Sequence, residues 1–126
     1  MKLLLDTHVF LWWRADSPKL KAKVRNAIAA GDNEVFISGA VAWEIVIKRA
    51  LGRLEFDGSV GAAATEEGFA PLPITLAHAD EVARLPDLHR DPFDRLLIAQ
   101  ARREGLTLVS HDKNIQAYEG FDRLLA

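Results

Sequence analysis

The chain has 126 residues, of which 49% are hydrophobic and 27% charged, and its formal net charge is −2. This composition is typical of a folded globular protein and excludes an intrinsically disordered one, and the length predicts a single domain over residues 1–126. Because the sequence contains no cysteine, a disulfide scaffold, a thiolate metal site and a cysteine nucleophile are all excluded.

The sequence has no membrane signal. A membrane-spanning helix needs about 20 apolar residues, and no run in this chain approaches that length. Asp6 interrupts the apolar N-terminal run, which therefore does not predict a signal peptide. We expect a cytoplasmic protein without membrane contacts.

The N-terminal part begins with a predicted strand. Residues 2–5 form a short, mostly leucine run that ends at Asp6, as expected for a buried parallel strand. A helix is predicted over residues 7–13. A second helix is predicted with Ser17 as its N-cap and Gly31 just past its end.

The middle of the chain continues the alternation of strands and helices. Residues 34–38 predict the second strand, and Ser38 at its end would cap a helix over residues 39–51. The pattern is weaker afterwards, with a helix predicted within residues 58–68 and a short strand between prolines within residues 69–74. Another helix follows and is closed by Pro86.

The C-terminal part contains the clearest helix, over residues 91–105, with Asp91 as N-cap before a proline. Residues 106–110 predict a strand, residues 112–120 contain a short helix, and residues 121–125 predict a final edge strand. Short apolar strands that alternate with helices predict an α/β fold with a mainly parallel sheet.

Two acids follow predicted strands directly. Asp6 ends the first strand, and Asp112 lies two residues after the strand at 106–110. Ligands of open parallel sheets bind beyond the carboxyl ends of the strands, so both acids lie where chemistry is expected. Helix capping is the structural alternative for each of them.

Glu44 is the only acid in an almost wholly apolar predicted helix. Its neighbours at i−3, i+3 and i+7 are apolar, so it lies within the apolar stripe. An ion pair with Lys48 at i+4 is the structural alternative, but such a pair normally occupies a solvated face. Because unpaired buried carboxylates are rare, the position favours a functional role.

Asp94 falls at the third position of the helix that Asp91 caps. An acid here suits the helix dipole, yet the residues at i+3, i+4 and i+7 are apolar, so Asp94 is expected at the rim of the core. Capping suffices to explain Asp91. The dipole does not account for the core-facing placement of Asp94.

Together these acids predict a cation site. Three or four carboxylates cannot share a site unless a cation neutralises them. Oxygen ligands, without cysteine and without histidine pairs at metal-binding spacing, indicate Mg²⁺ or Mn²⁺ rather than zinc. Such a site is typical of phosphodiester hydrolysis.

Four segments, LLLDTHVFLWW, SGAVAWEIVIK, DPFDRLLIAQAR and LVSHD, occur in an order and spacing that resemble the PIN-domain family, and more narrowly the VapC-type toxins of type II toxin–antitoxin systems. The resemblance covers nearly the whole chain. It implies a PIN-like α/β/α sandwich with a mainly parallel central sheet in a single domain. It also implies Mg²⁺- or Mn²⁺-dependent endoribonuclease activity on RNA, a cognate antitoxin that inserts a basic residue among the acids, and a homodimer.

The resemblance assigns the catalytic and metal-binding roles to Asp6, Glu44, Asp94 and Asp112. It implies that Asp6 and Asp94 are direct ligands of the ion. Glu44 is a ligand or orients a water molecule held by the ion, and Asp112 is a ligand, directly or through water. Ser110 matches a small polar residue beside the fourth acid, and the roles of Ser110 and His111 stay open.

Basic and aromatic side chains near these acids are candidates for RNA contacts. Seven cations lie on or beside the two helices that carry Glu44 and Asp94, namely Lys48, Arg49, Arg53, Arg90, Arg95, Arg102 and Arg103. They could contact phosphates, although a solvated surface is the simpler expectation for each. Three histidines adjoin the acids, namely His8, His89 and His111, but no pair has the spacing of a zinc helix. Because a metal-bound water is already acidified and needs no base, no catalytic histidine is predicted. Trp12, Trp13 and Trp43 lie in apolar helices, which predicts core or dimer packing rather than base stacking.

Other functions fit the residues less well. A Mg²⁺-dependent phosphatase of the haloacid dehalogenase type needs a second aspartate two residues after Asp6, where the chain has His8. A phospho-receiver domain needs an acid pair near the first strand, which is missing. A non-catalytic RNA-binding module on the same scaffold would be expected to have lost acids, and all four are present. A PIN-type RNA-processing nuclease without a toxin role stays open.

Overall fold

The computed structural model describes residues 1–126 and is built around a five-stranded sheet. Its strands are β1 (Lys2–Leu5), β2 (Glu34–Ser38), β3 (Ala70–Leu72), β4 (Thr107–Ser110) and β5 (Asp122–Leu125). Their spatial order is β3-β2-β1-β4-β5, and every neighbouring pair is parallel. The predicted strands and the α/β class are confirmed, and the sheet is parallel throughout.

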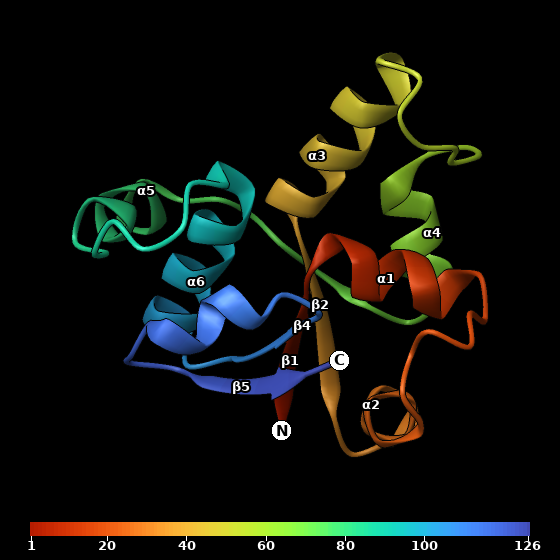
Figure 1. Ribbon diagram of the computed structural model, residues 1–126. Coiled ribbons are helices and arrows are strands. Elements are labelled where there is room, and N and C mark those ends of the chain that lie inside the picture. The colour runs from red at the N-terminus through yellow and green to blue at the C-terminus, as the bar shows by residue number, and fades with distance from the viewer.

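Helices cover both faces of this sheet, as parallel connections require. They are α1 (Thr7–Arg14), α2 (Ala22–Ala29), α3 (Gly39–Ala50), α4 (Val60–Glu66), α5 (Leu76–Ala83), α6 (Pro92–Glu104) and the 3₁₀ helix η1 (Lys113–Ala117). In Figure 1, α5 and α6 lie to the left of the sheet, and α1, α2 and α4 lie to its right. This is the expected α/β/α sandwich. None of the helices has the length and apolar character needed to cross a membrane.

The core is organised by β1, the central strand. Leu3, Leu4 and Leu5 are fully buried because β1 is paired on both edges and covered on both faces. Leu4 lies between Phe36 of β2 and Leu108 of β4 in the register of the sheet. The continuous apolar run at the start of the sequence therefore becomes the middle of the molecule.

The order of the strands creates a switch point at the ends of β1 and β4. From β1 the chain proceeds outward to β2 and β3, and it later returns to β4 on the other side of β1 and continues to β5. Ligands of open α/β sheets bind at such a reversal, beyond the carboxyl ends of the strands. Asp6 and Asp112 follow β1 and β4, so both lie at this edge.

One predicted helix boundary is wrong. Helix α2 begins at Ala22 rather than next to Ser17, and its N-cap residue Lys21 makes no side-chain capping bond. The guanidinium of Arg25 donates to the carboxylate of Asp16 and to the carbonyl of Ser17, both at 2.7 Å. These contacts hold the Ser17 segment in a separate turn, in which the hydroxyl of Ser17 accepts from the Lys19 N–H at 3.2 Å.

Candidate active site

Asp6 is a buried carboxylate that ties the ends of β1 and β4 together. It is 2% exposed, and its Oδ1 accepts the Val9 N–H at 2.9 Å as the N-cap of α1. Its Oδ2 accepts from the Ser110 hydroxyl at 2.7 Å and from the backbone N–H and Nδ1 of His111, each at 3.1 Å. Asp6 therefore caps α1, as the structural alternative predicted, but only through Oδ1, while Oδ2 binds the segment that follows β4.

Ser110 links Asp6 to Asp112 through its hydroxyl. Besides donating to Asp6, its hydroxyl accepts the backbone N–H of Asp112 at 3.0 Å. Asp112 uses Oδ1 to cap η1 through the Asn114 N–H at 2.9 Å, which leaves Oδ2 directed toward other partners. Thus the segment after β4 places a serine, a histidine and an aspartate around the end of β1.

Asp94 and Asp112 meet at the same imidazole nitrogen. Nε2 of His89 lies 2.9 Å from Oδ2 of Asp94 and 3.0 Å from Oδ2 of Asp112. Asp94 projects from the first turn of α6, and the loop between α5 and α6 supplies His89. All three side chains are partly buried, and these ligand atoms lie within 4.8 Å of one another.

The surroundings of Asp94 disfavour its negative charge. Burial raises the pKa of Asp94 to about 6, and the nearby charges of Asp91 and Asp6 act in the same direction. The hydrogen bond and the charge of His89 oppose this shift. A cation bound beside this carboxyl would stabilise its ionised form and take the place of its proton.

Glu44 is buried, as its place in the apolar stripe predicted. It is 4% exposed, its Oε1 accepts the hydroxyl of Thr7, and its Oε2 binds the ammonium of Lys48. The ion pair with Lys48, which the sequence did not favour, therefore exists, with a buried carboxylate at one end and a lysine side chain that is 34% exposed at the other. Since Thr7 follows Asp6 directly, its hydroxyl places Glu44 beside the end of β1.

The structure thus arranges the four sequence-predicted acids around one edge of the sheet, but not equivalently. Asp94 and Asp112 approach each other at ligand distance together with His89, whereas Asp6 and Glu44 are not part of that group. Sequence reasoning missed the nitrogen of His89 because it searched for histidine pairs within a helix. The sequence held one indication of a shared site, since His89 lies only five residues before Asp94.

Several of the candidate RNA-binding cations have partners within the protein. Arg95 donates to the carbonyls of Pro86 and Val82 at 2.9 and 3.3 Å, and Arg49 donates to that of Phe56 at 2.9 Å. Arg102 pairs with Glu81, and Lys48 with Glu44. The exposed members of the set are Arg53, Arg90 and Arg103.

Aromatic rings border the acids. The His8 and His111 rings lie 4.2 Å apart, and Trp12 meets His111 edge-on at 5.5 Å. Burial lowers the pKa of His8, whereas the hydrogen bond with Asp6 raises the pKa of His111. Trp12 and Trp13 pack against the core as predicted. Trp43 is 59% exposed, so core packing is wrong for this residue, and dimer packing stays a prediction.

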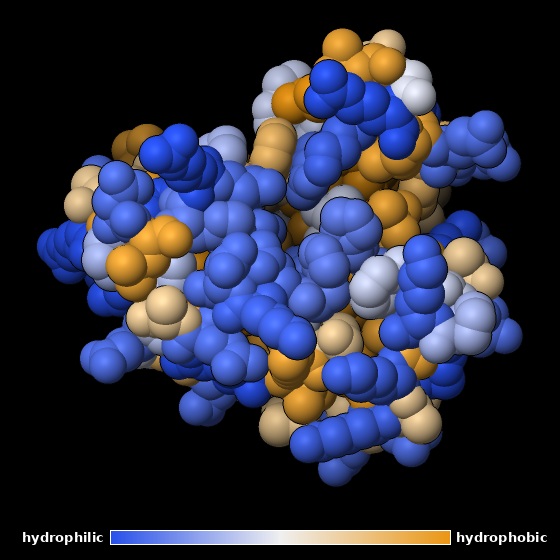
Figure 2. Space-filling model, in the orientation of Figure 1, coloured by the Kyte–Doolittle hydropathy of each residue, from blue (hydrophilic) through white to orange (hydrophobic).

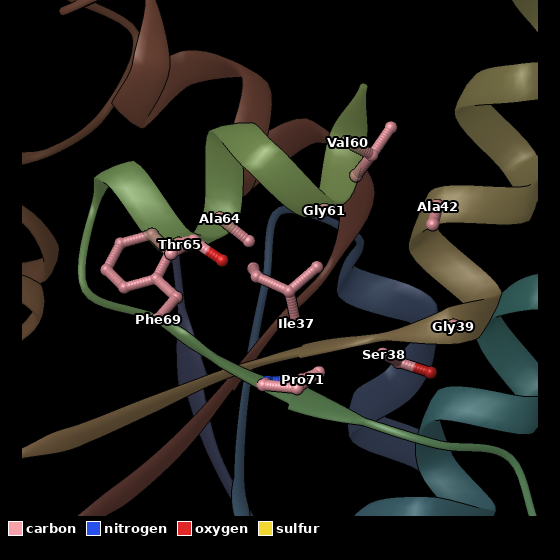
Figure 3. Close-up of a pocket in the computed structure, with 10 residues that line it drawn as sticks. All are labelled: Ile37, Ser38, Gly39, Ala42, Val60, Gly61, Ala64, Thr65, Phe69 and Pro71. Carbon is pink, nitrogen blue, oxygen red and sulfur yellow. The ribbon is translucent and has the colours of Figure 1, made fainter.

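An apolar hollow lies between α3 and α4. It has a volume of about 320 Å³, and Figure 3 shows its lining side chains, among them Ile37, Ala42, Ala64 and Phe69. None of the four acids lines it. Apolar residues gather over α3 in Figure 2. Helix α3 also carries the exposed side chains of Val46 and Trp43. This surface is thus distinct from the acidic one.

Comparison with known proteins places the chain in a family. A family model described as "PIN domain" matches residues 3–120. The chain is 29% identical over 120 residues to "Ribonuclease VapC22" of Mycobacterium tuberculosis, and the match covers 92% of this chain and 91% of that protein.

Solved structures share the fold across the whole chain. VapBC2 of Rickettsia felis, solved bound to a promoter DNA fragment, superposes with a TM-score of 0.70 at 15% identity and covers 100% of this chain and 99% of its own. VapC20 of Mycobacterium tuberculosis, described as a sarcin-ricin loop cleaving toxin, gives 0.59 at 19% identity and covers 98% and 99%. The convergence of acids at the switch point of a parallel sheet and the match over residues 3–120 agree, and the chain belongs to the PIN domain family.

Proposed function

We propose that this protein is a VapC-type toxin, an endoribonuclease that hydrolyses RNA phosphodiester bonds with a divalent ion held in its acidic cluster. The observation that carries the proposal is the approach of Asp94, Asp112 and His89 to ligand distance beside Asp6. Similarity to VapC22 over nearly the whole chain supports ribonuclease activity, and the fold shared with VapBC complexes supports the toxin role.

The residues present fit a divalent ion of the Mg²⁺ or Mn²⁺ kind. Two carboxylate oxygens and one imidazole nitrogen converge from α6, the loop before it and the end of β4. The raised pKa of Asp94 and the negative charges around it call for a compensating cation. When bound, the ion would neutralise charge on the phosphate and make a water molecule a stronger nucleophile.

The protein's own groups would orient that chemistry. Asp94 and Asp112 would hold the ion, and Asp94 would release its proton as the ion binds. Asp6 is fixed by Ser110 and His111, so it offers a preorganised negative charge at the end of β1. Glu44 is fixed by Thr7 and Lys48, which suits it to orient a water molecule or to serve as a further ligand.

We assign the antitoxin to the apolar hollow between α3 and α4. Four of the solved structures with this fold are toxin–antitoxin complexes or VapBC pairs. The apolar lining of the hollow and the exposed aromatic side chain of Trp43 on α3 suit the apolar, aromatic-rich centre of a protein interface. A homodimer and a cytoplasmic location stay predictions from the sequence, and sedimentation and cell fractionation would test them.

An RNA-processing nuclease without a toxin role is the alternative function. The site would be the same, so only the partner distinguishes the two. A small reading frame next to the gene whose product binds the protein and blocks cleavage supports the toxin role. A non-catalytic RNA-binding module predicts binding of RNA without any cleavage.

The test is incubation of the purified, antitoxin-free protein with total cellular RNA. Reactions contain Mg²⁺ or Mn²⁺, and parallel ones contain chelator or the Asp94→Asn variant. Recurrent cleavage that disappears in both controls is expected, because both remove the ion from the cluster. Cleavage that persists in chelator, or in the variant, contradicts the proposal.

A further inference from the structure

His89 stands between two carboxylates of the candidate site, and capping and core packing do not account for this position. It belongs to the loop between α5 and α6, and its side chain is only 14% exposed. Its Nε2 is 2.9 Å from Asp94 and 3.0 Å from Asp112. The imidazole therefore joins an acid of α6 to an acid that follows β4.

These separations match those of neighbouring ligands around one ion. A small divalent ion binds its ligands at about 2.1 Å in octahedral geometry. Two ligands at a right angle are then about 3.0 Å apart, since the separation is the ligand distance multiplied by the square root of two. Both separations measured from Nε2 of His89 are compatible with this value, and they equal the length of an N–H···O hydrogen bond as well.

One imidazole nitrogen faces two carboxylate oxygens in this group. Nε2 carries at most one hydrogen, so it can make one good hydrogen bond but has two carboxylate oxygens at contact distance. A divalent ion placed among the three atoms would satisfy both oxygens and the nitrogen at once. The three atoms are therefore placed as a ligand set for one ion would be.

Arg95 of α6 holds the loop that carries His89 through hydrogen bonds to its backbone. Arg95, the residue after Asp94, donates to the carbonyl of Pro86 at 2.9 Å and to that of His89 itself at 3.4 Å. It also donates to the hydroxyl of Tyr118 at 3.2 Å. Because Arg95 belongs to the same helix as Asp94, the imidazole and the carboxylate are positioned together.

We propose that His89 is a ligand of the divalent ion together with Asp94 and Asp112, and that its nitrogen makes the site prefer Mn²⁺ to Mg²⁺. Carboxylate and water oxygens suit Mg²⁺, whereas imidazole nitrogen favours transition-metal ions. The inference rests on the proposed function, since it concerns the same ion, and it replaces the all-oxygen donor set expected from the sequence.

Electron paramagnetic resonance of Mn²⁺ bound to the metal-free protein tests the ligand directly. Pulsed spectra of the wild type are expected to show modulation from a coordinated imidazole nitrogen. The signal should vanish in His89→Ala and in His89→Gln, each checked for folding by thermal unfolding. It should persist in His8→Ala, a matched control that removes a neighbouring imidazole.

Calorimetric titration without RNA measures the preference. The His89 variants are expected to lose affinity for Mn²⁺ by about tenfold or more and for Mg²⁺ by less, so that the preference shrinks. Nitrogen modulation that persists in the variants, or that is absent from wild type with Mn²⁺ bound, overturns the inference. So does a wild type that fails to bind Mn²⁺.

Cleavage of RNA separates this inference from the proposed function. If cleavage requires a divalent ion and Asp94 but the nitrogen signal is absent, the ribonuclease proposal stands and the role of His89 is refuted. If cleavage continues in chelator, the ribonuclease mechanism itself fails, whatever His89 binds.

Discussion

Replacing Asp94 with asparagine is expected to stabilise the metal-free protein while it removes function. Burial and neighbouring carboxylates raise the pKa of Asp94 from 3.8 to about 6. At 1.36 kcal/mol for each pKa unit, the folded state at neutral pH is disfavoured by about 3 kcal/mol relative to an unperturbed carboxyl. Asparagine keeps nearly the same shape and carries no charge, so Asp94→Asn should recover much of this free energy.

The stability difference between Asp94→Asn and the wild type should increase with pH. The unfolded chain releases the Asp94 proton near pH 3.8, whereas the folded chain retains it to about pH 6. Between these values the folded state binds more protons, so this residue lowers the free energy of unfolding as pH rises. The advantage of Asp94→Asn is therefore absent below pH 3.8 and complete above about pH 6.

Urea unfolding in chelator, followed by circular dichroism from pH 4.5 to 7.5, measures the effect. We expect Asp94→Asn to exceed the wild type by about 1–3 kcal/mol at pH 7 and by less at pH 4.5. Asp87→Asn, which removes an exposed acid from the loop before α6, is the control and should show no such trend. A variant that is no more stable than wild type at pH 7 would refute this account of the site's electrostatics.

Four further predictions concern other parts of the structure. Glu44→Gln should lower the cleavage rate or the Mn²⁺ affinity by about 10–100-fold, because it removes the charge held beside the site, and an unchanged rate and affinity would contradict its role. His78→Ala should lower the free energy of unfolding by about 2–4 kcal/mol in urea, since this 1% exposed ring binds a backbone N–H and a carboxylate; a loss below about 0.5 kcal/mol would contradict this. In nuclear magnetic resonance titrations without metal, the His111 ring should have a midpoint above 6.5 that falls in Asp6→Asn, and an unchanged midpoint would show that their hydrogen bond does not control it. Gly61→Glu places a charge beside the apolar hollow at a helix position where a side chain fits, so a co-expressed cognate antitoxin should no longer co-purify, and undiminished co-purification would place the antitoxin elsewhere.

The strands and the acids were predictable because their signals are local. A continuous apolar run predicts a buried parallel strand, and an acid at its end lies at the edge of the sheet whatever the details of packing. Asp6 and Asp112 followed from this rule. Asp94 and Glu44 followed from helical periodicity, which places a residue on a buried stripe without knowledge of its partners.

What the sequence did not reveal depends on contacts between segments. The start of α2 is set by the contacts of Arg25 with the preceding turn, which override a good capping signal at Ser17. His89 enters the site from a loop, where no periodicity indicates direction. Periodicity also could not tell that Trp43 faces solvent, because α3 is apolar on more than one side.

The chemistry of the new RNA ends tests the central claim most directly. If Asp6, Asp94 and Asp112 surround a divalent ion that activates water for attack on the phosphorus, early cleavage products carry linear phosphate ends. One oxygen of each new end then comes from labelled solvent water. Mass spectrometry of products from single-turnover reactions in Mn²⁺ detects that label. Linear ends that contain solvent oxygen, formed by the wild type and not by Asp94→Asn, are the result we predict. Ends with 2′,3′-cyclic phosphate, formed equally in chelator, would show that the RNA's own hydroxyl attacks, and would contradict a metal-dependent hydrolase.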